Sequence, residues 1–397
     1  MLPVAKHIVP PFWMVDYRSV KIMRALGAYE AEPQVLFVGG CVRNSLLGKP
    51  VSDIDIATVH QPLAVIEKLK SAGIRYVPTG LDHGTVTAIV EDVCFEVTSL
   101  RRDIDTDGRY AVIAFTTKWE EDAQRRDFTI NTLLAGMDGA VYDPTGAGLE
   151  DIENRRVAFV GEPAQRIAED YLRILRFFRF YAQYGEGAPD KAALDACAEK
   201  AGKISSLSRE RVTQEFLKTL AVANPAPVLR LMFSKGILSD VGKEFKEVEM
   251  ERLCDLQARY DARDIMARMF TVAGMKANCF EERFTLSNVQ KRQIEVFAQG
   301  AEIAKSVSKK RMRELVYRVG NAAALQVYFL YLSKNDRLPD IELIEIARYW
   351  KPPTFPVKAE DLIRAGVMQG PALGRTLKEQ EGKWIAKDFP ANFRYKK

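Results

Sequence analysis

Short apolar runs separated by turn residues dominate the first 150 residues of the chain. They include VLFVGG at 35–40, DIDIATV at 53–59, HGTVTAIV at 83–90 and CFEVTSL at 94–100. Helical stretches such as QPLAVIEKLKSAG lie between some of these runs. Strand-like runs that alternate with helices indicate a mixed α/β domain.

The pattern changes to helix after about residue 155. Apolar positions recur with a period near 3.6 in RIAEDYLRILRFFRFYAQYG and again in SRERVTQEFLKTLAV. Prolines and glycine at 225, 227 and 236, and prolines at 352, 353 and 356, mark breaks between helical segments. The sequence therefore predicts an α+β fold: an N-terminal α/β head followed by an all-helical extension.

Composition fits a soluble protein of several domains. The 397 residues are 47% hydrophobic and 28% charged, and charge interrupts every apolar stretch well before a membrane span is reached. Lys and Arg exceed Asp and Glu by 58 − 53 = 5, a surplus that permits nucleic-acid binding only if the charge is clustered. We expect two to four domains at this length, and no membrane partner.

Cysteine and histidine usage narrows the chemistry. The five cysteines are scattered without a CxxC pair, which argues against structural zinc and disulfides and favours a reducing cytoplasm. Of the three histidines, no two lie one helical turn apart and none precedes an aspartate. Metal chemistry based on histidine is therefore nearly excluded.

A glycine pair follows the first strand-like run. Gly39 and Gly40 let the backbone approach a phosphate closely at a strand–helix turn, and Arg43 adds a donor for a triphosphate oxygen. The alternative is a tight turn with a surface arginine. Because glycine pairs are common, this cluster alone leaves both interpretations open.

Two aspartates, Asp53 and Asp55, follow, the first of them ten residues after Arg43. On a strand, Asp53 and Asp55 face one side while Ile54 and Ile56 face the core. Two carboxylates this close repel each other, and oxygen ligands of this kind suit Mg²⁺ in phosphoryl transfer. Glu96, within CFEV, is the best candidate for a third catalytic acid on a neighbouring strand, although an outward-facing charge is nearly as good an explanation.

A third cluster reads RRDFTIN. The adjacent arginines Arg125 and Arg126 are candidates for binding a triphosphate, with Asp127 fixing their orientation. The alternative is that Asp127 or Thr129 merely caps a helix.

The fourth cluster is the most informative. In a continuous helix, Asp170 and Arg173 lie on one face, and Arg176 and Arg179 continue along it. Cytosine and adenine both present an amino donor beside a ring-nitrogen acceptor, so Asp170 can accept while Arg173 donates. Uracil and guanine present the reverse order, and each buried mismatch costs about 1–3 kcal/mol. The alternative is an ordinary surface salt bridge.

These clusters, in this order, resemble the class II branch of the polymerase-β-like nucleotidyltransferases, and within it the bacterial and mitochondrial CCA-adding enzymes. The resemblance covers roughly residues 30 to 220 and rests on GGCVR, DIDIAT, HGTVTA, RRDFTIN, EDYLRILR and LSRERVTQEF. It implies template-independent addition of CMP, CMP and AMP to the 3′ end of tRNA from CTP and ATP. The partners implied are tRNA and both nucleotides; the oligomeric state is left open.

The resemblance also implies roles for residues. Asp53 and Asp55 would hold Mg²⁺, and the nucleotide would contact the residues Gly40, Arg43, Arg126, Asp170, Arg173, Arg176 and Arg179. The segment 102–109 falls where the family has a mobile loop that is thought to help switch from C to A addition. The domains expected are a head at 1–155, a neck at 156–222, a body at 223–300 and a tail at 301–397.

Two departures from the family pattern stand out. Asn44 occupies a position where the family usually has aspartate, and we expect it to have a local capping or turn role. The chain has no His-Asp dipeptide, so the phosphohydrolase domain of some relatives is missing and its activities are not transferred.

Three rival functions remain open at this point. They are a bacterial poly(A) polymerase, an enzyme restricted to CC or A addition, and an inactive protein that only binds tRNA. A basic cluster in the tail can bind RNA phosphates in any of these cases, or form a solvated helix face; it comprises Lys305, Lys309, Lys310, Arg311, Arg313 and Arg318.

Overall fold

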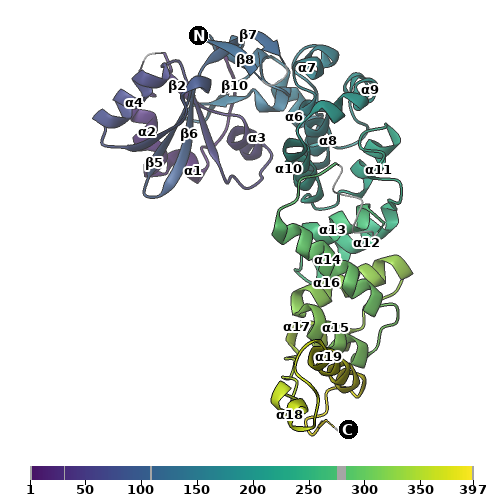
Figure 1. The fold of residues 1–397 in the computed structure, drawn as a ribbon. Coiled ribbons are helices and arrows are strands. Elements are labelled where there is room, and N and C mark those ends of the chain that lie inside the picture. The colour runs from purple at the N-terminus through teal and green to yellow at the C-terminus, as the bar shows by residue number, and fades with distance from the viewer. Residues whose placement is uncertain (1, 31, 108–109, 275–282, 396–397) are drawn as a thin grey trace. The chain divides into compact units, whose positions relative to one another are not determined.

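The computed structural model describes residues 2–30, 32–107, 110–274 and 283–395. The chain forms two compact units, one of Met1–Glu215 with Lys235–Ile237 and one of Phe216–Ser234 with Leu238–Lys397. Figure 1 shows a sheet in the first unit and helices in the second. The predicted α+β fold is confirmed. The four-domain division stays a prediction, and its expected neck is cut by the unit boundary after Glu215.

An eight-stranded sheet organises the first unit. Its strand order is β1-β10-β9-β2-β3-β6-β5-β4, and every neighbouring pair is antiparallel except β3 and β6. The strands are β1 (Val4–His7), β2 (Val35–Val38), β3 (Ile54–Thr58), β4 (Arg75–Gly80), β5 (Thr85–Val90), β6 (Val93–Ser99), β9 (Leu134–Ala135) and β10 (Ala140–Tyr142). All four residues of β2 are buried, which explains its continuous apolar run.

The parallel pairing of β3 with β6 sets the position of the acidic residues. Its register places Asp55 opposite Glu96. On the other side of β6, Glu96 is opposite Thr87 of β5. Two acidic residues far apart in the sequence thus become neighbours in the centre of the sheet.

A separate antiparallel ribbon follows the sheet. It consists of β7 (Arg101–Asp107) and β8 (Tyr110–Phe115), and β7 falls largely in the segment 102–109 where a mobile loop was expected. Gly108 and Arg109 lie outside the described residues. The root of the ribbon contacts α5 (Trp119–Gln124), the short helix that leads to the arginine pair.

Helices complete the first unit. Besides α5, those among the strands are α1 (Phe12–Val15), α2 (Tyr17–Ala25), α3 (Gly40–Leu46) and α4 (Pro62–Ser71), and α6 (Gly148–Glu153) follows the last strand. The later ones are α7 (Pro163–Glu169), α8 (Leu172–Tyr184), α9 (Lys191–Glu199) and α10 (Arg209–Leu220), which crosses the unit boundary. Helix α8 buries a row of aromatic rings that includes Phe177, Phe178 and Phe180, so apolar packing fixes the helix that carries the predicted arginines.

The described residues of the second unit form only helices and loops. They are α11 (Ala226–Ser234), α12 (Glu247–Arg259), α13 (Ile265–Val272), α14 (Asn288–Ile303), α15 (Lys309–Val319), α16 (Asn321–Asn335), α17 (Ile341–Tyr349), α18 (Ala359–Arg364) and α19 (Pro371–Ala386). Helix α16 buries most of its residues and packs against α12, α14, α15 and α17, as expected for a central core helix. None of the described helices is long and apolar enough to cross a membrane.

Candidate active site

A cavity of about 530 Å³ opens in the first unit between the sheet and α8. Its walls carry six arginines and three aspartates, together with the glycine pair and three other side chains: Gly39, Gly40, Arg43, Asp55, Arg125, Arg126, Asp127, Asn131, Asp170, Leu172, Arg173, Arg176, Phe180 and Arg211. An excess of guanidinium groups over carboxylates in one concave site suits a polyphosphate ligand. The structure thus brings together residues from all four predicted clusters.

The glycine pair forms the turn from β2 into α3. Gly39 adopts φ +73° and ψ −122°, which a residue with a side chain rarely takes. A Cβ there would lie 3.6 Å from Nη1 of Arg126. The backbone conformation, and not a lack of space, therefore calls for glycine at this turn, and Arg126 lies within contact distance of it.

The side chain of Arg43 is bound by neutral hydrogen-bond acceptors and an aromatic ring. It is 6% exposed, donates to Tyr184 Oη at 2.6 Å and to Asn131 Oδ1, and its guanidinium carbon lies 4.0 Å from the centre of the Tyr184 ring. Nε and Nη2 also donate to Asn44 Oδ1 at 3.2 and 3.0 Å. Burial lowers the pKa of Arg43.

Asn44 does more than the expected local role. Its Nδ2 donates to the carbonyl of Pro50 at 2.9 Å, which is a local loop contact. Its Oδ1 also orients Arg43, as a neutral acceptor where the family usually has a carboxylate. A neutral acceptor leaves the positive charge of Arg43 uncancelled toward the cavity.

The predicted catalytic acids are not equally placed. Asp55 lines the cavity, whereas Asp53 and Glu96 are exposed and do not line it. Asp53 precedes β3 and accepts from Ser52 Oγ at 2.8 Å. Burial raises the pKa of the Asp55 carboxyl, and the neighbouring charges of Glu96 and Asp53 raise it further.

This donor set fits a divalent metal ion. Excess negative charge around Asp55 is what a divalent cation relieves, and all the side-chain donors are carboxylate oxygens. Within the described ranges, no group of three or more His, Cys, Asp or Glu side chains is gathered closely enough to hold a metal alone. Mg²⁺ does not need such a cage, because it is usually held by one or two carboxylates, water and substrate phosphates.

The arginine pair is oriented by a different aspartate from the one expected. Asp122 Oδ2 accepts from Nε and Nη2 of Arg126 at 3.1 and 3.0 Å, and Oδ1 accepts from Nε of Arg125 at 2.9 Å. Asp127 instead pairs with Arg176 and accepts from Asn131 Nδ2 at 3.0 Å. The expectation that Asp127 fixes the pair was wrong, since its carboxylate is turned toward α8.

The helix expected through Asp170 is broken. Helix α7 ends at Glu169, Asp170 is extended with φ −156° and ψ 107°, and α8 begins at Leu172. The break follows from the aspartate itself, because Asp170 Oδ1 accepts from the backbone N–H of Leu172 at 3.0 Å and competes with helical bonding. Asp170 and Arg173 therefore do not share one continuous helix face, but both line the cavity.

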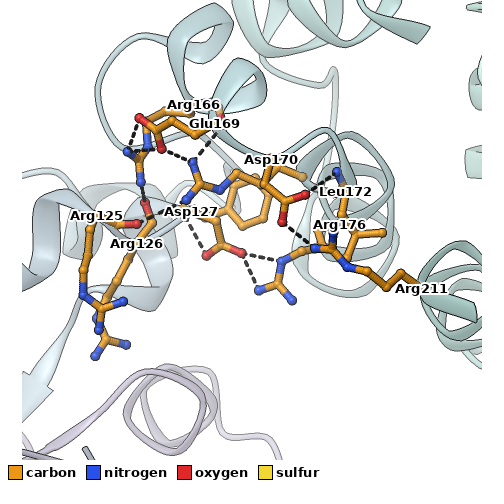
Figure 2. A network of polar contacts seen from close by, with 11 residues as sticks. Arg125, Arg126, Asp127, Arg166, Glu169, Asp170, Leu172, Arg176 and Arg211 are labelled. Carbon is orange, nitrogen blue, oxygen red and sulfur yellow. Dashed lines mark hydrogen bonds and ion pairs between the residues drawn. The ribbon is translucent and has the colours of Figure 1, made fainter. Parts of the chain in front are cut away.

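Asp170 and Arg173 also have different partners from those expected. Nη2 of Arg211 donates to Asp170 Oδ2 at 2.6 Å. Nη1 of Arg173 donates to Glu169 Oε2 at 2.5 Å and to the carbonyl of Arg166 at 2.8 Å. Figure 2 shows this network, with Arg211 reaching Asp170 from the helix at the right of the view. The carboxylate and guanidinium are thus held apart by separate anchors instead of pairing with each other.

Of the two remaining arginines that were predicted to contact the nucleotide, one lines the cavity and the other does not. Arg176 lines the cavity and binds Asp127. Arg179 does not line the cavity: its Nε lies 2.8 Å from Glu215 Oε2, and its guanidinium carbon lies 4.4 Å from the centre of the Phe180 ring. The structure therefore places Arg179 in support of α8 and away from the nucleotide position expected for it.

The basic cluster of the second unit is largely neutralised. Lys305 pairs with Glu302 and Lys309 with Glu342, both at 2.5 Å, and Arg311 pairs with Glu314 at 2.6 Å. Two members connect α15 to the end of α19, because Arg313 pairs with Asp388 and Lys310 donates to the Ala386 carbonyl at 2.6 Å. Whether this cluster binds RNA phosphates or is a solvated helix face therefore stays a prediction.

Sequence reasoning missed Asp122 and Arg211. Asp122 had a visible signal, since it lies three and four residues before Arg125 and Arg126, the spacing of contacts on a helix. Arg211 lies within the quoted motif LSRERVTQEF, but nothing in its spacing indicates that it reaches Asp170.

A sheet head with a glycine turn, clustered carboxylates and an arginine-lined cavity defines a nucleotidyltransferase. The family model "Poly A polymerase head domain" matches residues 35–158, and "Probable RNA and SrmB- binding site of polymerase A" matches residues 188–248. A mitochondrial CCA tRNA nucleotidyltransferase 1 from Danio rerio is 34% identical over 370 residues, covering 88% of this chain and 83% of the relative. The human protein of that name is 32% identical, covering 94% and 88%.

The chain therefore belongs to the family of CCA tRNA nucleotidyltransferases. Its fold matches the crystal structure of the Bacillus stearothermophilus CCA-adding enzyme in complex with CTP, with a TM-score of 0.76 and 24% identity over 96% of this chain and 94% of that one. It also matches a Thermotoga maritima CCA-adding enzyme complexed with tRNA, with a TM-score of 0.64 and 19% identity over 96% and 95%.

Proposed function

We propose that this chain adds CMP, CMP and AMP in turn to the 3′ end of tRNA from CTP and ATP. One observation carries the assignment to a site: Asp55, Arg126, Asp170 and Arg173 line the same cavity. Chemistry at the α-phosphate and reading of the base can therefore occur on one bound nucleotide. The whole-length similarity to named CCA tRNA nucleotidyltransferases favours this activity over poly(A) synthesis.

Nucleotidyltransferases of this family are generally metal-dependent. We assign Mg²⁺ to Asp53 and Asp55, with Glu96 as the third acid beside Asp55 in the sheet. When bound, the ion lowers the pKa of the attacking hydroxyl and neutralises phosphate charge. The tRNA 3′-oxygen bonds to the α-phosphorus, the bond from that phosphorus to the bridging oxygen breaks, and pyrophosphate leaves. The hydroxyl proton passes to one of the carboxylates of Asp53, Asp55 and Glu96.

Arginines bind the polyphosphate. Arg126 lies against the glycine turn, and Arg43 presents a charge that no directly bonded carboxylate cancels. Guanidinium groups bind phosphate oxygens through paired N–H donors, which suits both the incoming triphosphate and the departing pyrophosphate. Gly40 and Arg176 line the same cavity, and Arg179 supports α8 from outside it.

Asp170 and Arg173 read the base. Asp170 retains acceptor capacity, because a carboxylate has about four lone-pair sites and the observed bonds use one on each oxygen. The amino group of cytosine or adenine donates to Asp170, and Arg173 donates to the adjacent ring nitrogen. Uracil and guanine would oppose acceptor to acceptor and donor to donor, at about 1–3 kcal/mol for each unmatched group.

Lys305, Lys309, Lys310, Arg311 and Arg313 remain proposed contacts for tRNA phosphates. Lys305, Lys309 and Arg311 are the best of these, because their side chains are at least half exposed. Lys305 and Lys309 pair with exposed glutamates, and Arg311 pairs with the largely covered Glu314. For the compartment we propose the cytoplasm, since the four described cysteines are free thiols. Curated relatives include mitochondrial proteins.

Sequencing of product 3′ ends tests this function. Purified protein receives a tRNA that ends at the discriminator base, with CTP and ATP supplied separately and together. Addition of CCA followed by a stop supports the proposal. A long A tail would show a poly(A) polymerase, termination at CC or addition of A alone would show a partial enzyme, and no addition would leave only tRNA binding.

A further inference from the structure

A buried carboxylate lies beneath the cavity without lining it. Asp122, on α5, is 3% exposed, and its two oxygens bind the guanidinium groups of both neighbouring cavity arginines. Nη2 of Arg125 is 2.7 Å from Oδ1, and Nη2 of Arg126 is 3.0 Å from Oδ2. Each arginine thus has an oxygen of its own on a single aspartate.

The surroundings of Asp122 are strongly positive. Arg101 lies beside Arg125 and Arg126, and burial together with those like charges lowers its pKa to about 10. Burial by itself raises the pKa of Asp122, but the charges of Arg126 and Arg125 outweigh it, so the net pKa is lowered. One carboxylate therefore separates and fixes guanidinium groups that would otherwise repel each other.

Asp122 also holds the root of the ribbon. Its Oδ1 accepts from the backbone N–H of Arg101 at 3.3 Å, and Nε of Arg125 donates to the carbonyl of Arg101 at 3.1 Å. Arg101 is the first residue of β7. The same carboxylate thus fixes the start of the ribbon and the direction of both arginines.

We propose that Asp122 is a positioning residue for the polyphosphate end of the incoming nucleotide. It holds Arg126 against the Gly39 turn, where a triphosphate common to CTP and ATP passes. It has no direct bond to the base-reading residues Asp170 and Arg173; Arg173 bonds to the backbone carbonyl of Arg125 and not to the guanidinium that Asp122 holds. Loss of the Asp122 charge should therefore weaken the binding of CTP and of ATP equally and leave the choice of base unchanged. This inference rests on the proposed role of Arg126 in polyphosphate binding.

Asp122→Asn tests the inference, because asparagine keeps the shape but loses the charge that fixes both arginines. We expect KM for CTP and for ATP to rise together by about 10-fold or more, with a smaller change in kcat. Direct binding of CTP and CMP to the full chain gives the second readout: the ratio of their affinities should fall toward one, because CMP lacks the β- and γ-phosphates.

Asp151→Asn is the matched control. Asp151 is also 3% exposed and lies in the same unit, but it accepts from Thr129 Oγ1 and does not line the cavity. This variant should keep the wild-type ratio of CTP to CMP affinity even if its stability falls. If the ratio of CTP to CMP affinity falls equally in both variants, the effect is general destabilisation and the inference is overturned.

Arg126→Ala separates this inference from the proposed function. If Arg126→Ala weakens CTP binding and Asp122→Asn does not, the positioning role fails while the proposed site stands. If Arg126→Ala leaves the ratio of CTP to CMP affinity unchanged, the polyphosphate role of Arg126 fails and the inference fails with it. With both correct, adding Asp122→Asn to Arg126→Ala should lower that ratio by much less than Asp122→Asn does alone.

Discussion

Nη2 of Arg211 on α10 donates at 2.6 Å to Oδ2 of Asp170, which lies 41 positions earlier in the break between α7 and α8. The other oxygen of Asp170 accepts from the backbone N–H of Leu172, the first residue of α8. These two bonds fix the plane of the carboxylate, so the direction in which it accepts from a nucleobase is set before the nucleotide arrives. Preorganisation of this kind is what discrimination between similar bases requires.

Arg211→Ala should therefore loosen base choice. We expect kcat/KM for CTP and ATP to fall by about 10-fold, because the interaction of a charged hydrogen-bond partner is lost. Incorporation of UTP should rise relative to CTP, since a freely rotating Asp170 discriminates less. Steady-state kinetics with all four nucleotides measures both effects. Arg211→Lys keeps the charge and should retain part of the selectivity; an unchanged ratio of UTP to CTP in the alanine variant would contradict the role.

Loss of the acidic residues should stop chemistry without releasing tRNA. Asp53→Ala and Asp55→Asn should each reduce incorporation by a factor of about 1,000 or more, while the Kd for tRNA stays within about 2-fold of wild type. A gel-based addition assay and a filter-binding assay give the two values. Asp92→Asn, which alters an exposed surface pair with Arg75, is the control and should behave as wild type. Normal turnover by Asp53→Ala would exclude the proposed metal position.

The base-reading pair can be tested by reversing its hydrogen-bonding sense. Asp170→Arg with Arg173→Asp should favour UTP and GTP, but it places the new arginine against Arg211. We therefore expect poor activity from the double variant and better activity, with the reversed preference, once Arg211→Glu is added. Incorporation of single nucleotides into a CCA-less tRNA gives the preference. Strict C and A selectivity in the triple variant would rule out reading by this pair.

Asp127 should contribute to stability in a pH-dependent way. Burial raises the pKa of Asp127, but its pairing with Arg176 outweighs burial and the net pKa is lowered. Because the pKa of Asp127 is lower in the folded state, its contribution to the unfolding free energy is fully present above 3.8, the pKa in the unfolded chain. This contribution is lost as the pH falls through the pKa of the folded state. Asp127→Asn should lower the unfolding free energy by about 3 kcal/mol at pH 7.

Denaturant titrations between pH 7 and pH 3 measure this difference. The difference in unfolding free energy between wild type and Asp127→Asn should begin to decrease as the pH drops below about 4. Asp195→Asn is the control, because Asp195 forms an exposed pair with Lys191 and its loss should change little. A gap that stays constant down to pH 3 would contradict the assigned cause.

The basic cluster of the second unit should separate into binding and structural members. Lys305→Ala, Lys309→Ala and Arg311→Ala together should weaken tRNA binding and reduce the slope of log Kd against log salt by about two to three. Arg313→Ala should mainly lower the melting temperature, because it removes the pairing of α15 with Asp388. An unchanged salt slope in the triple variant would remove these residues from the RNA surface.

Much of the fold and part of the site could be predicted from local patterns. Val35–Val38 and Ile54–Thr58 are strands because their apolar residues must be buried, and these two runs give the positions of the glycine turn and the acidic strand. The break at Asp170 was not predictable from periodicity, since the apolar pattern runs through it while a side chain takes the N–H of Leu172. Long-range ion pairs such as Arg211 with Asp170 depend on the packing of helices, which spacing does not encode.

The most direct test of the account is a structure of this chain with CTP and Mg²⁺ bound. We expect the cytosine amino group to lie within hydrogen-bond distance of the Asp170 carboxylate, and the ring nitrogen within that distance of the Arg173 guanidinium. In the same molecule, the phosphates should lie between Asp55 and Arg126. A cytosine that contacts neither Asp170 nor Arg173 while its phosphates occupy the cavity would contradict the claim that side chains take the place of a template.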